Sequence, residues 1–503
     1  MFQRYTESWD ELRHVIPAAK YAHFGLTGSP FQPLSCTESL RLRMCGAAVH
    51  LAERLVGVPL YAENEYRELA MIEPRVCNLL LKLIKEGLVT DWRIGQAVPD
   101  LPPVVSCNLT LKEIVLPSGK KMRMGGSTGG GVGWTLSEAL VPALGEILER
   151  YSMTQWHEGE LVRGTYDDLH KNGAIDPKLF SFYSEKQLSR SEFARNRIQH
   201  NASFHWTHAR SLLEERDVLV PAQLAYVFYG DNCPDATQFW ETSSSGVAAG
   251  ISYADATARA ILEAVERDAF MIFWLNQLTP PRVRLDTIPD VDVTRLIDEC
   301  ARYRLELYVL DCTSDLGIPT FVTVIIDQHG SMPVSVSAAS DFDPLIAIRK
   351  SVWEGMKLSR VAPKIVDGSL SPEKIMTIQD RYRFLYTVGR EYVSFLLMGA
   401  EQSYDETIAR HRIEMNRERV GMLARLLREK KYPCYLVDLT TPEAREAELC
   451  VVRAIIPDLV PLHFREAKPH LGVQRLYEVP LRMGYGRGAK DESEINTRPH
   501  PFL

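Results

Sequence analysis

The stretch that decides the fold occurs twice in this chain of 503 residues. Residues 127–150 read STGGGVGWTLSEALVPALGEILER, and residues 244–267 read SSGVAAGISYADATARAILEAVER. The two copies align 117 positions apart without a gap. In each copy a loop of small residues leads into a stretch with helical character that ends in two glutamates and an arginine. We therefore predict two copies of one loop-and-helix unit.

A third segment shares this register. A cap-like sequence, SDFDP at residues 340–344, opens a predicted helix in which Ala347 precedes Glu354 by seven positions. Ala139 precedes Glu146 by the same spacing in the first copy. Three helices with a common pattern of small residues and glutamates predict a common pocket.

The chemistry of that pocket follows from its carboxylates. Glutamates three positions apart lie on one face of a helix and repel each other, so the pattern predicts a cation between them. Carboxylates suit Mg²⁺ held together with phosphate oxygens, and neighbouring arginines suit the phosphates themselves. The alternative is a solvated helix face on which the glutamates merely pair with Arg150 and Arg267. The repetition favours the pocket.

Composition and motifs exclude several other classes. The chain is 45% hydrophobic and 24% charged, with a net charge of −7 that does not favour nucleic acid or anionic membranes. Nine cysteines without a CxxC pair fit a reduced, cytoplasmic protein without a zinc site. There is no signal peptide, no membrane-spanning run and no HExxH. The loop at residues 125–131 lacks the lysine of a P-loop, and a Rossmann reading is weak.

The pattern along the chain predicts two parts. Residues 1–105 read as a small, mostly helical region whose helix, glycine and apolar return at residues 79–89 suit a winged-helix-like element. A proline cluster at residues 99–103 ends this region. Residues 106–503 read as alternating helices and strands, α/β or α+β in class. Strands are expected at residues 307–310, 320–327, 435–440 and 450–456, a charged stretch with a helical pattern at 371–431, and an extended tail at 497–503.

Several motifs in this order resemble the YcaO superfamily. The two glutamate segments resemble its ATP motifs, the second with Ser245 in its loop and Trp274 after its helix. DCTSDLGIP at residues 311–319, DLTTP at 438–442, VRAIIP at 452–457 and the Pro-x-Pro ending resemble the azoline-forming branch. This branch contains the D-type cyclodehydratases, which make thiazole and oxazole rings in ribosomal peptides. The resemblance covers about residues 105–503.

The resemblance implies a YcaO-type ATP-binding fold and ATP- and Mg²⁺-dependent cyclodehydration of Cys, Ser and Thr residues. It implies a precursor peptide as substrate, a ThiF-like leader-binding partner protein that residues 1–105 could dock, and an FMN-dependent azoline dehydrogenase as a further partner. Whether the azolines are oxidised, and whether the protein is a homodimer, stays open. At the positions that match the family's motifs, the resemblance implies that Glu146, Glu149, Glu266 and Glu354 hold metal. It implies that the same residues bind the nucleotide together with Arg150, Ser245, Glu263, Arg267 and Lys350.

Three positions depart from the family pattern. Pro142 stands where the family has a serine, Lys350 where it has an arginine beside Arg349, and Leu503 where it has a final proline. The tail is thought to reach the active site in this branch, which makes Leu503 the catalytic candidate; a disordered tail is the alternative. Two rival functions remain: another amide-activating reaction, forming thioamides or amidines, and a non-catalytic docking subunit.

Overall fold

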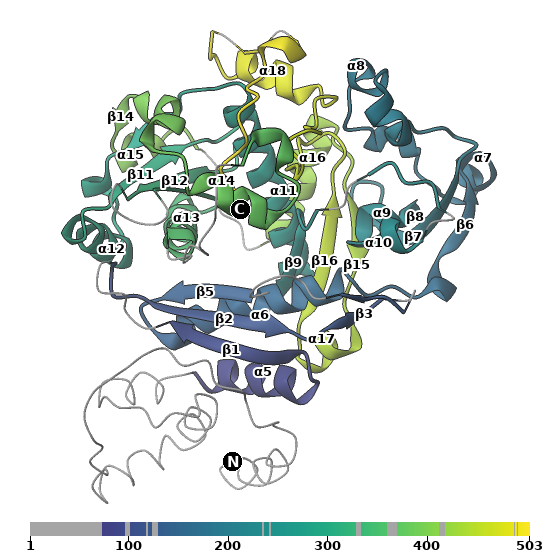
Figure 1. Cartoon of the computed structure of the whole chain (residues 1–503), viewed down its shortest axis with the longest axis horizontal. Coiled ribbons are helices and arrows are strands. Elements are labelled where there is room, and N and C mark those ends of the chain that lie inside the picture. The colour runs from purple at the N-terminus through teal and green to yellow at the C-terminus, as the bar shows by residue number, and fades with distance from the viewer. Residues whose placement is uncertain are drawn as a thin grey trace, which may run out of the picture. The chain divides into compact units, whose positions relative to one another are not determined.

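The structure, a computed structural model, divides into two compact units (Figure 1). The first contains residues 1–97, 103–114 and 123–151, and the second contains residues 98–102, 115–122 and 152–503. The residues described are 73–95, 101–116, 119–122, 129–233, 236–240, 243–327, 333–359, 370–411, 418–486, 488–489 and 491–502. Most of the predicted docking region therefore lies outside the described residues, and so does Leu503.

The first unit contains a helix, an antiparallel sheet of order β1-β2-β5 and a second helix. Pro74 suits the first turn of α5 because its missing N–H needs no partner there, and Gly87, with φ +68°, turns the chain back into β1. The predicted helix, glycine stop and apolar return are confirmed. The elements are α5 (Pro74–Lys85), β1 (Val89–Gly95), β2 (Val105–Leu111), β5 (Gly129–Gly133) and α6 (Leu136–Ser152).

The boundary between these units differs from the one expected near residue 105. Because β2 pairs with β5, which leads directly into α6, the first glutamate helix is grouped with the N-terminal unit. A docking role for residues 1–105 stays a prediction. A short pair, β3 (Ile114–Val115) and β4 (Lys121–Met122), follows β2 in the chain.

The second unit contains two larger sheets. The first has the order β6-β7-β15-β16-β9, with β8 also paired to β7, and all of its pairs are antiparallel. Its strands are β6 (Val162–Thr165), β7 (Ser203–Ser211), β8 (Arg216–Pro221), β9 (Val247–Gly250), β15 (Tyr435–Asp438) and β16 (Cys450–Ile455). Turns and short helices lie around it: η1 (Glu158–Glu160), α7 (Tyr166–Leu169), η2 (His170–Asn172), η3 (Pro177–Phe180), α8 (Glu185–Leu188), η4 (Ser191–Asn196), α9 (Ala222–Ala225) and α10 (Tyr229–Asn232).

The second sheet of this unit has the order β13-β12-β11-β10-β14, in which only the last pair is parallel. The residues of β12 and β13 are buried on both faces. β12 (TFVTVII) is mostly apolar, whereas β13 (VSVSAAS) has three serines, of which Ser337 donates to the carbonyl of Ser351 (2.7 Å). Its elements are β10 (Arg282–Val283), η5 (Leu285–Thr287), α12 (Val291–Arg302), β11 (Glu306–Asp311), β12 (Thr320–Ile326), β13 (Val334–Ser340), α13 (Pro344–Ser359) and β14 (Glu401–Gln402).

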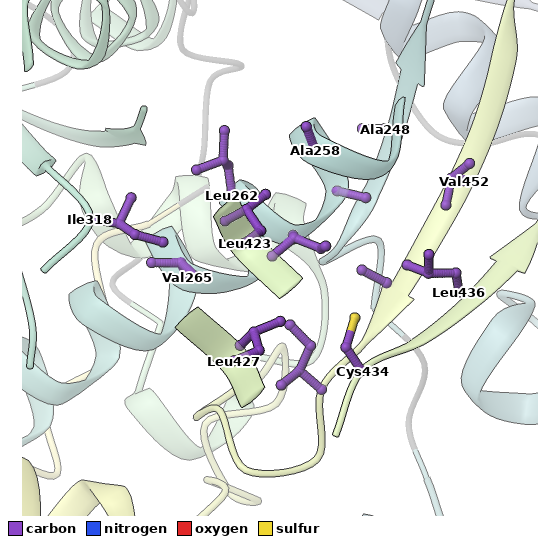
Figure 2. Close-up of a cluster of buried hydrophobic side chains, with 14 of the residues drawn as sticks. Ala248, Ala258, Leu262, Val265, Ile318, Leu423, Leu427, Cys434, Leu436 and Val452 are labelled. Carbon is purple, nitrogen blue, oxygen red and sulfur yellow. The ribbon is translucent and has the colours of Figure 1, made fainter. Parts of the chain in front are cut away.

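Helix α11 (Tyr253–Leu275) is the centre of the second unit, because it packs against β9 and β16 of one sheet and β13 of the other. Leu262 and Val265 of α11 lie among buried side chains that include Leu423 and Leu427 of α16 (Arg419–Lys430) (Figure 2). Burying each such leucine contributes about 2 kcal/mol. The helix that bears the second glutamate pair is therefore held rigidly from several sides.

The stretch from 371 to 431, expected to be helical in pattern, contains three separate α-helices, α14, α15 and α16. Thr377 and Ser403 each open a new helix with a capping box, and Gly389 and Gly399 lie between the two helices. Besides α16, the elements of this stretch are η6 (Pro372–Lys374), α14 (Ile378–Leu385), η7 (Arg390–Tyr392), η8 (Ser394–Met398) and α15 (Tyr404–Ile408). Further along the chain, α17 (Pro442–Glu446) lies between β15 and β16, and α18 (Arg475–Arg482) and η9 (Glu492–Glu494) follow β16.

The C-terminal tail has no helix or strand between residues 495 and 502, as the alternating prolines predict. It is not a loose end, because His500 and Phe502 are buried. Among the described residues, no helix is both long and apolar enough to cross a lipid bilayer.

Candidate functional site

The repeated sequence produces the same local structure twice. In the first copy Glu138 accepts a hydrogen bond from Trp134 N (2.7 Å), and in the second Asp255 accepts one from Ile251 N (3.2 Å). Both acidic side chains thus satisfy backbone N–H groups at the start of a helix. A small-residue strand, a capped turn and a glutamate-bearing helix follow in the same order in both copies, so the repeat is confirmed as a structural unit. The segment expected as a loop is, however, a strand in each copy, β5 in the first and β9 in the second.

A glutamate in each copy binds its own small-residue segment. Gly130 N donates to Glu146 Oε2 (2.8 Å), and Glu146 Oε1 lies 2.5 Å from Arg150 Nη2. Glu263 accepts a backbone hydrogen bond from Gly246 and lies 3.3 Å from Arg267 Nη2. The glutamates of the two helices are therefore oriented toward the strand that precedes them and not into bulk solvent.

Three glutamates of the second unit share one electrostatic environment. Burial raises the pKa of Glu266 to about 7; Arg267 opposes the shift, and the nearby charges of Glu263 and Glu354 add to it. Burial also raises the pKa of Glu263. Helices α11 and α13, distant in sequence, thus bring their carboxylates close enough to repel. A cluster of this kind fits a divalent cation, because oxygen ligands of high charge suit Mg²⁺.

Arg267 lies among these carboxylates. Its guanidinium is 3.1 Å from Glu266 Oε1 and is covered by the ring of Phe502, 4.2 Å from the ring centroid. Its buried Nε has no hydrogen-bond partner within the described part of the chain. An unpaired donor of a buried guanidinium fits an anionic ligand such as a phosphate oxygen, in agreement with the predicted role of Arg267.

Lys350 is held at the edge of the cluster by a buried acid. Its Nζ lies 2.8 Å from Asp341 Oδ2, and Arg419 binds the other oxygen of the same carboxylate. Burial would raise the pKa of Asp341, but these two cations lower it. Lys350 also lowers the pKa of Glu266, so its charge reaches the cluster. Arg349 does not take its place, because Asp290 binds it (Nε–Oδ2 2.8 Å).

Sequence reasoning missed Arg453. This arginine lies on β16 opposite Val247, is buried, and donates from Nη1 to the carbonyl of Ala225 (3.3 Å), while its Nε has no partner within the described residues. Burial lowers the pKa of Arg453 to about 10, and the charge of Glu263 opposes this shift. The signal was present in the sequence, since an arginine inside the apolar run VVRAII is costly to bury without a role.

The remaining predicted residues are placed as follows. Ser245 lies half-buried in the loop before β9, next to Gly246. Pro142 lies inside α6, which continues through it, and its side chain is exposed. Glu149 is half-buried on α6, and Leu503 lies outside the described residues. Because α6 belongs to the first unit, the convergence of Glu146, Glu149 and Arg150 with the cluster on α11 and α13 stays a prediction.

Comparison with known proteins identifies the family. Residues 130–460 match the family model described as YcaO cyclodehydratase, ATP- and Mg²⁺-binding. An uncharacterized protein of Methanothermobacter thermautotrophicus is 25% identical over 343 residues, which cover 65% of this chain and 80% of the relative.

Solved structures agree in fold. A heterocyclase in complex with substrate and cofactor matches with a TM-score of 0.65 at 22% identity, over 84% of this chain and 57% of that one. YcaO from Methanopyrus kandleri, bound with AMPPCP and Mg²⁺, gives 0.54 at 16% identity over 76% and 90%. The E. coli microcin synthetase McbBCD complex with pro-MccB17 bound gives 0.54 at 14% identity over 82% and 96%. The chain thus spans little more than half of the first of these proteins.

The predicted fold class, family and cofactors are thereby confirmed. A mixed helix-and-sheet fold, a family model that covers well over half of the chain, and a carboxylate cluster suited to Mg²⁺ agree with one another. The chain belongs to the YcaO cyclodehydratase family, a family of ATP- and Mg²⁺-binding enzymes.

Proposed function

We propose that this protein converts Cys, Ser or Thr residues of a ribosomally made precursor peptide into thiazolines or oxazolines. The observation that carries the proposal is the cluster of Glu263, Glu266 and Glu354 around Arg267, in which three carboxylates outnumber the cations of Arg267 and Lys357 that pair with them. Family membership supplies ATP and Mg²⁺ as the ligands that suit it.

The proposed reaction solves a leaving-group problem. The thiol or hydroxyl of the substrate adds to the carbonyl carbon of the preceding peptide bond and gives up its proton. The former carbonyl oxygen then takes the γ-phosphoryl group of ATP, and ADP leaves. The nitrogen forms a C=N bond as the C–O bond to phosphate breaks and the N–H proton departs. The products are azoline, ADP and phosphate, and positioning of the phosphoryl group supplies most of the catalysis.

The chain's own residues would divide this work by their chemistry. Glu146, Glu149, Glu266 and Glu354 are proposed to hold metal, which would neutralise phosphate charge when bound. The arginines suit phosphate oxygens because their planar guanidinium groups make paired hydrogen bonds. We extend this phosphate-binding role to Arg453, whose buried Nε makes no hydrogen bond within the described ranges. The proposed nucleotide-binding residues are Glu146, Glu149, Arg150, Ser245, Glu263, Glu266, Arg267, Lys350 and Glu354.

Partner proteins are part of the proposal. The precursor peptide would be delivered by a ThiF-like leader-binding protein, with residues 1–105 as the docking region. The microcin synthetase McbBCD, whose structure has pro-MccB17 bound, has a similar fold in a multi-protein assembly and supports this organisation. An FMN-dependent azoline dehydrogenase, homodimer formation and a cytoplasmic location belong to the same proposal.

Mass spectrometry of the peptide product tests the reaction. The protein is incubated with ATP, Mg²⁺, a ThiF-like protein and a Cys/Ser/Thr-rich peptide encoded beside its gene. We expect the loss of one water per ring formed, and no reaction with Glu263→Gln. A gain in mass from exchange of oxygen for sulfur would instead show thioamide formation. An unmodified peptide, combined with no nucleotide binding by the wild type, would support the docking subunit.

A further inference from the structure

A second buried polar cluster lies in the same unit, and the proposed reaction does not use it. It consists of Arg381 on α14, His463 and Glu466 in the segment after β16, and His500 in the tail, and we refer to these four residues as the Arg381 latch. The Arg381 side chain is 1% exposed. A fully buried arginine is rare without several partners, because removing its charge from water is costly.

Arg381 connects three segments of the chain. Its Nη1 donates to the carbonyl of His500 (2.7 Å) and forms an ion pair with Glu466, and its Nη2 donates to the carbonyl of Phe464 (2.9 Å). A planar guanidinium offers five donors in a fixed arrangement, which a lysine cannot reproduce. The tail is therefore tied by charge-assisted hydrogen bonds to a segment far from it in sequence.

The two histidines complete the latch. His463 Nε2 lies 3.3 Å from Glu466 Oε2, and His500 Nε2 lies 2.7 Å from the His463 carbonyl. Ligand atoms of His463, Glu466 and His500 lie within 4.8 Å of one another, a spacing that a metal ion could use. Arg381 already binds the carboxylate, however, so the cationic position is occupied by the protein itself. A structural anchor fits this arrangement better than a metal site.

On both sides of His500 the tail contacts helix α11, in the direction opposite to that of the helix. Asn496 N donates to the carbonyl of Leu275, and Trp274 Nε1 donates to the carbonyl of Arg498 (2.8 and 3.1 Å). At the end of this path Phe502 packs on Phe270, with ring centroids 4.8 Å apart, and covers Arg267. The latch thus lies on the tail two residues before the ring that contacts the glutamate cluster.

We infer that the Arg381 latch positions the C-terminal tail so that Phe502 holds the Arg267 guanidinium beside Glu263 and Glu266. Arg381 is then a positioning residue for the nucleotide, acting through Phe502. The inference rests on the proposed function, because Arg267 is useful in this orientation only if it binds a phosphate. It assigns a role to Arg381, Glu466 and Phe502 that the glutamate repeat does not suggest.

Full-length variants test the latch in two ways. Hydrogen exchange of the peptide covering residues 495–503, followed by mass spectrometry, reports whether the tail is docked. Calorimetric titration with Mg²⁺ and the ATP analogue AMPPCP reports the site. We expect Arg381→Met to speed exchange in the tail and to raise the Kd for Mg·AMPPCP about tenfold, the loss expected for a desolvated cation–π contact. Arg383→Met, on the same helix but 42% exposed, should change neither.

Substitutions at Phe502 separate positioning from folding, since they leave the buried charges intact. Phe502→Tyr keeps an aromatic face over Arg267 and should bind Mg·AMPPCP as the wild type does. Phe502→Leu keeps the apolar bulk without that face and should bind about tenfold more weakly, with the latch still protected from exchange. These variants keep the test decisive if Arg381→Met does not fold.

The outcomes distinguish the two proposals. If the wild type binds Mg·AMPPCP and Phe502→Leu binds it equally well, the latch inference is overturned and the proposed function stands. If the wild type does not bind Mg·AMPPCP, the proposed function fails and the latch inference fails with it. Rapid tail exchange in the wild type would also overturn the latch.

Discussion

The two copies of the repeat have the same local structure and different surroundings. In both, an acidic residue caps the turn and a glutamate binds the backbone of the preceding segment. Helix α11, however, has 23 residues and is packed between two sheets, whereas α6 has 17 residues beside one sheet of three strands. Within its own unit, the second copy therefore packs against two sheets and the first copy against one.

This difference shows which properties of the two copies follow from their shared sequence pattern and which follow from their surroundings. The order of strand, turn and helix follows from short-range rules such as capping and small-residue contacts. The chemistry of the glutamates follows from long-range packing, because burial and the neighbouring Glu354 raise the pKa of Glu266. Two copies of one motif can therefore contribute differently to ligand binding and stability. Matched substitutions at positions 117 residues apart measure this difference.

The largest effect is expected at the second glutamate of each copy, three positions after the first. Glu266→Gln should weaken Mg·AMPPCP binding by more than about 100-fold, because an amide is a poorer ligand for Mg²⁺ than a carboxylate. Its counterpart Glu149→Gln should do the same if both helices contribute to one site. Calorimetric titration measures both, with Glu185→Gln, 87% exposed, as the control. Full affinity in Glu149→Gln would place the first copy outside the site.

A stability effect should distinguish the strands of the two copies. A Cβ at Gly131 would lie 2.0 Å from the Ala139 carbonyl, so Gly131→Ala should destabilise the protein by about 3 kcal/mol or more. The counterpart is Ala248, where a methyl group is already accommodated and buried. Ala248→Gly should cost only about 1 kcal/mol, from lost burial and increased freedom of the unfolded chain. Urea unfolding of both variants checks the order; equal losses would contradict it.

Binding should depend on pH through the second copy. Glu266, with its pKa raised to about 7, carries a proton at pH 6 that a metal ligand must release. Mg·AMPPCP should therefore bind about tenfold more weakly at pH 6 than at pH 8. Calorimetry in two buffers of different ionisation enthalpy should detect release of about one proton at pH 6 and almost none at pH 8. No proton release at pH 6 would show that Glu266 is ionised in the free protein.

Sequence reasoning reached the fold class, the family and the local repeat because these depend on residues close together in the chain. Glu146 and Glu263 could be found by their register alone, and so could the start of α13. Arg453 has only a weak sequence signal, an arginine within an apolar run, and its place beside Glu263 comes from the pairing of β16 with β9, about 200 positions away in the chain. The breaks within residues 371–431 were missed because Thr377 and Ser403 were not read as helix caps.

The C-terminal tail is a second region where sequence reasoning missed long-range contacts. Its prolines predicted an extended chain correctly, yet they did not distinguish a disordered end from a docked one. The deciding contacts come from Arg381, Trp274 and Arg267, none of which is near the tail in sequence. Long-range polar contacts of this kind leave no periodic signal, and only the folded structure reveals them.

The smallest expected effect concerns Lys350, which has no counterpart in the first copy of the repeat. Its charge lowers the pKa of Glu266, so Lys350→Met should raise the midpoint of the pH dependence by roughly half a unit. Lys350→Arg should leave the midpoint unchanged, because Asp341 can hold a guanidinium as it holds the ammonium group at 2.8 Å. Titration of Mg·AMPPCP affinity between pH 6 and pH 8 measures the shift. A midpoint that does not move in Lys350→Met would mean that Asp341 and Arg419 screen this charge completely, and that burial, Arg267 and the carboxylates of α11 and α13 set the pKa of Glu266.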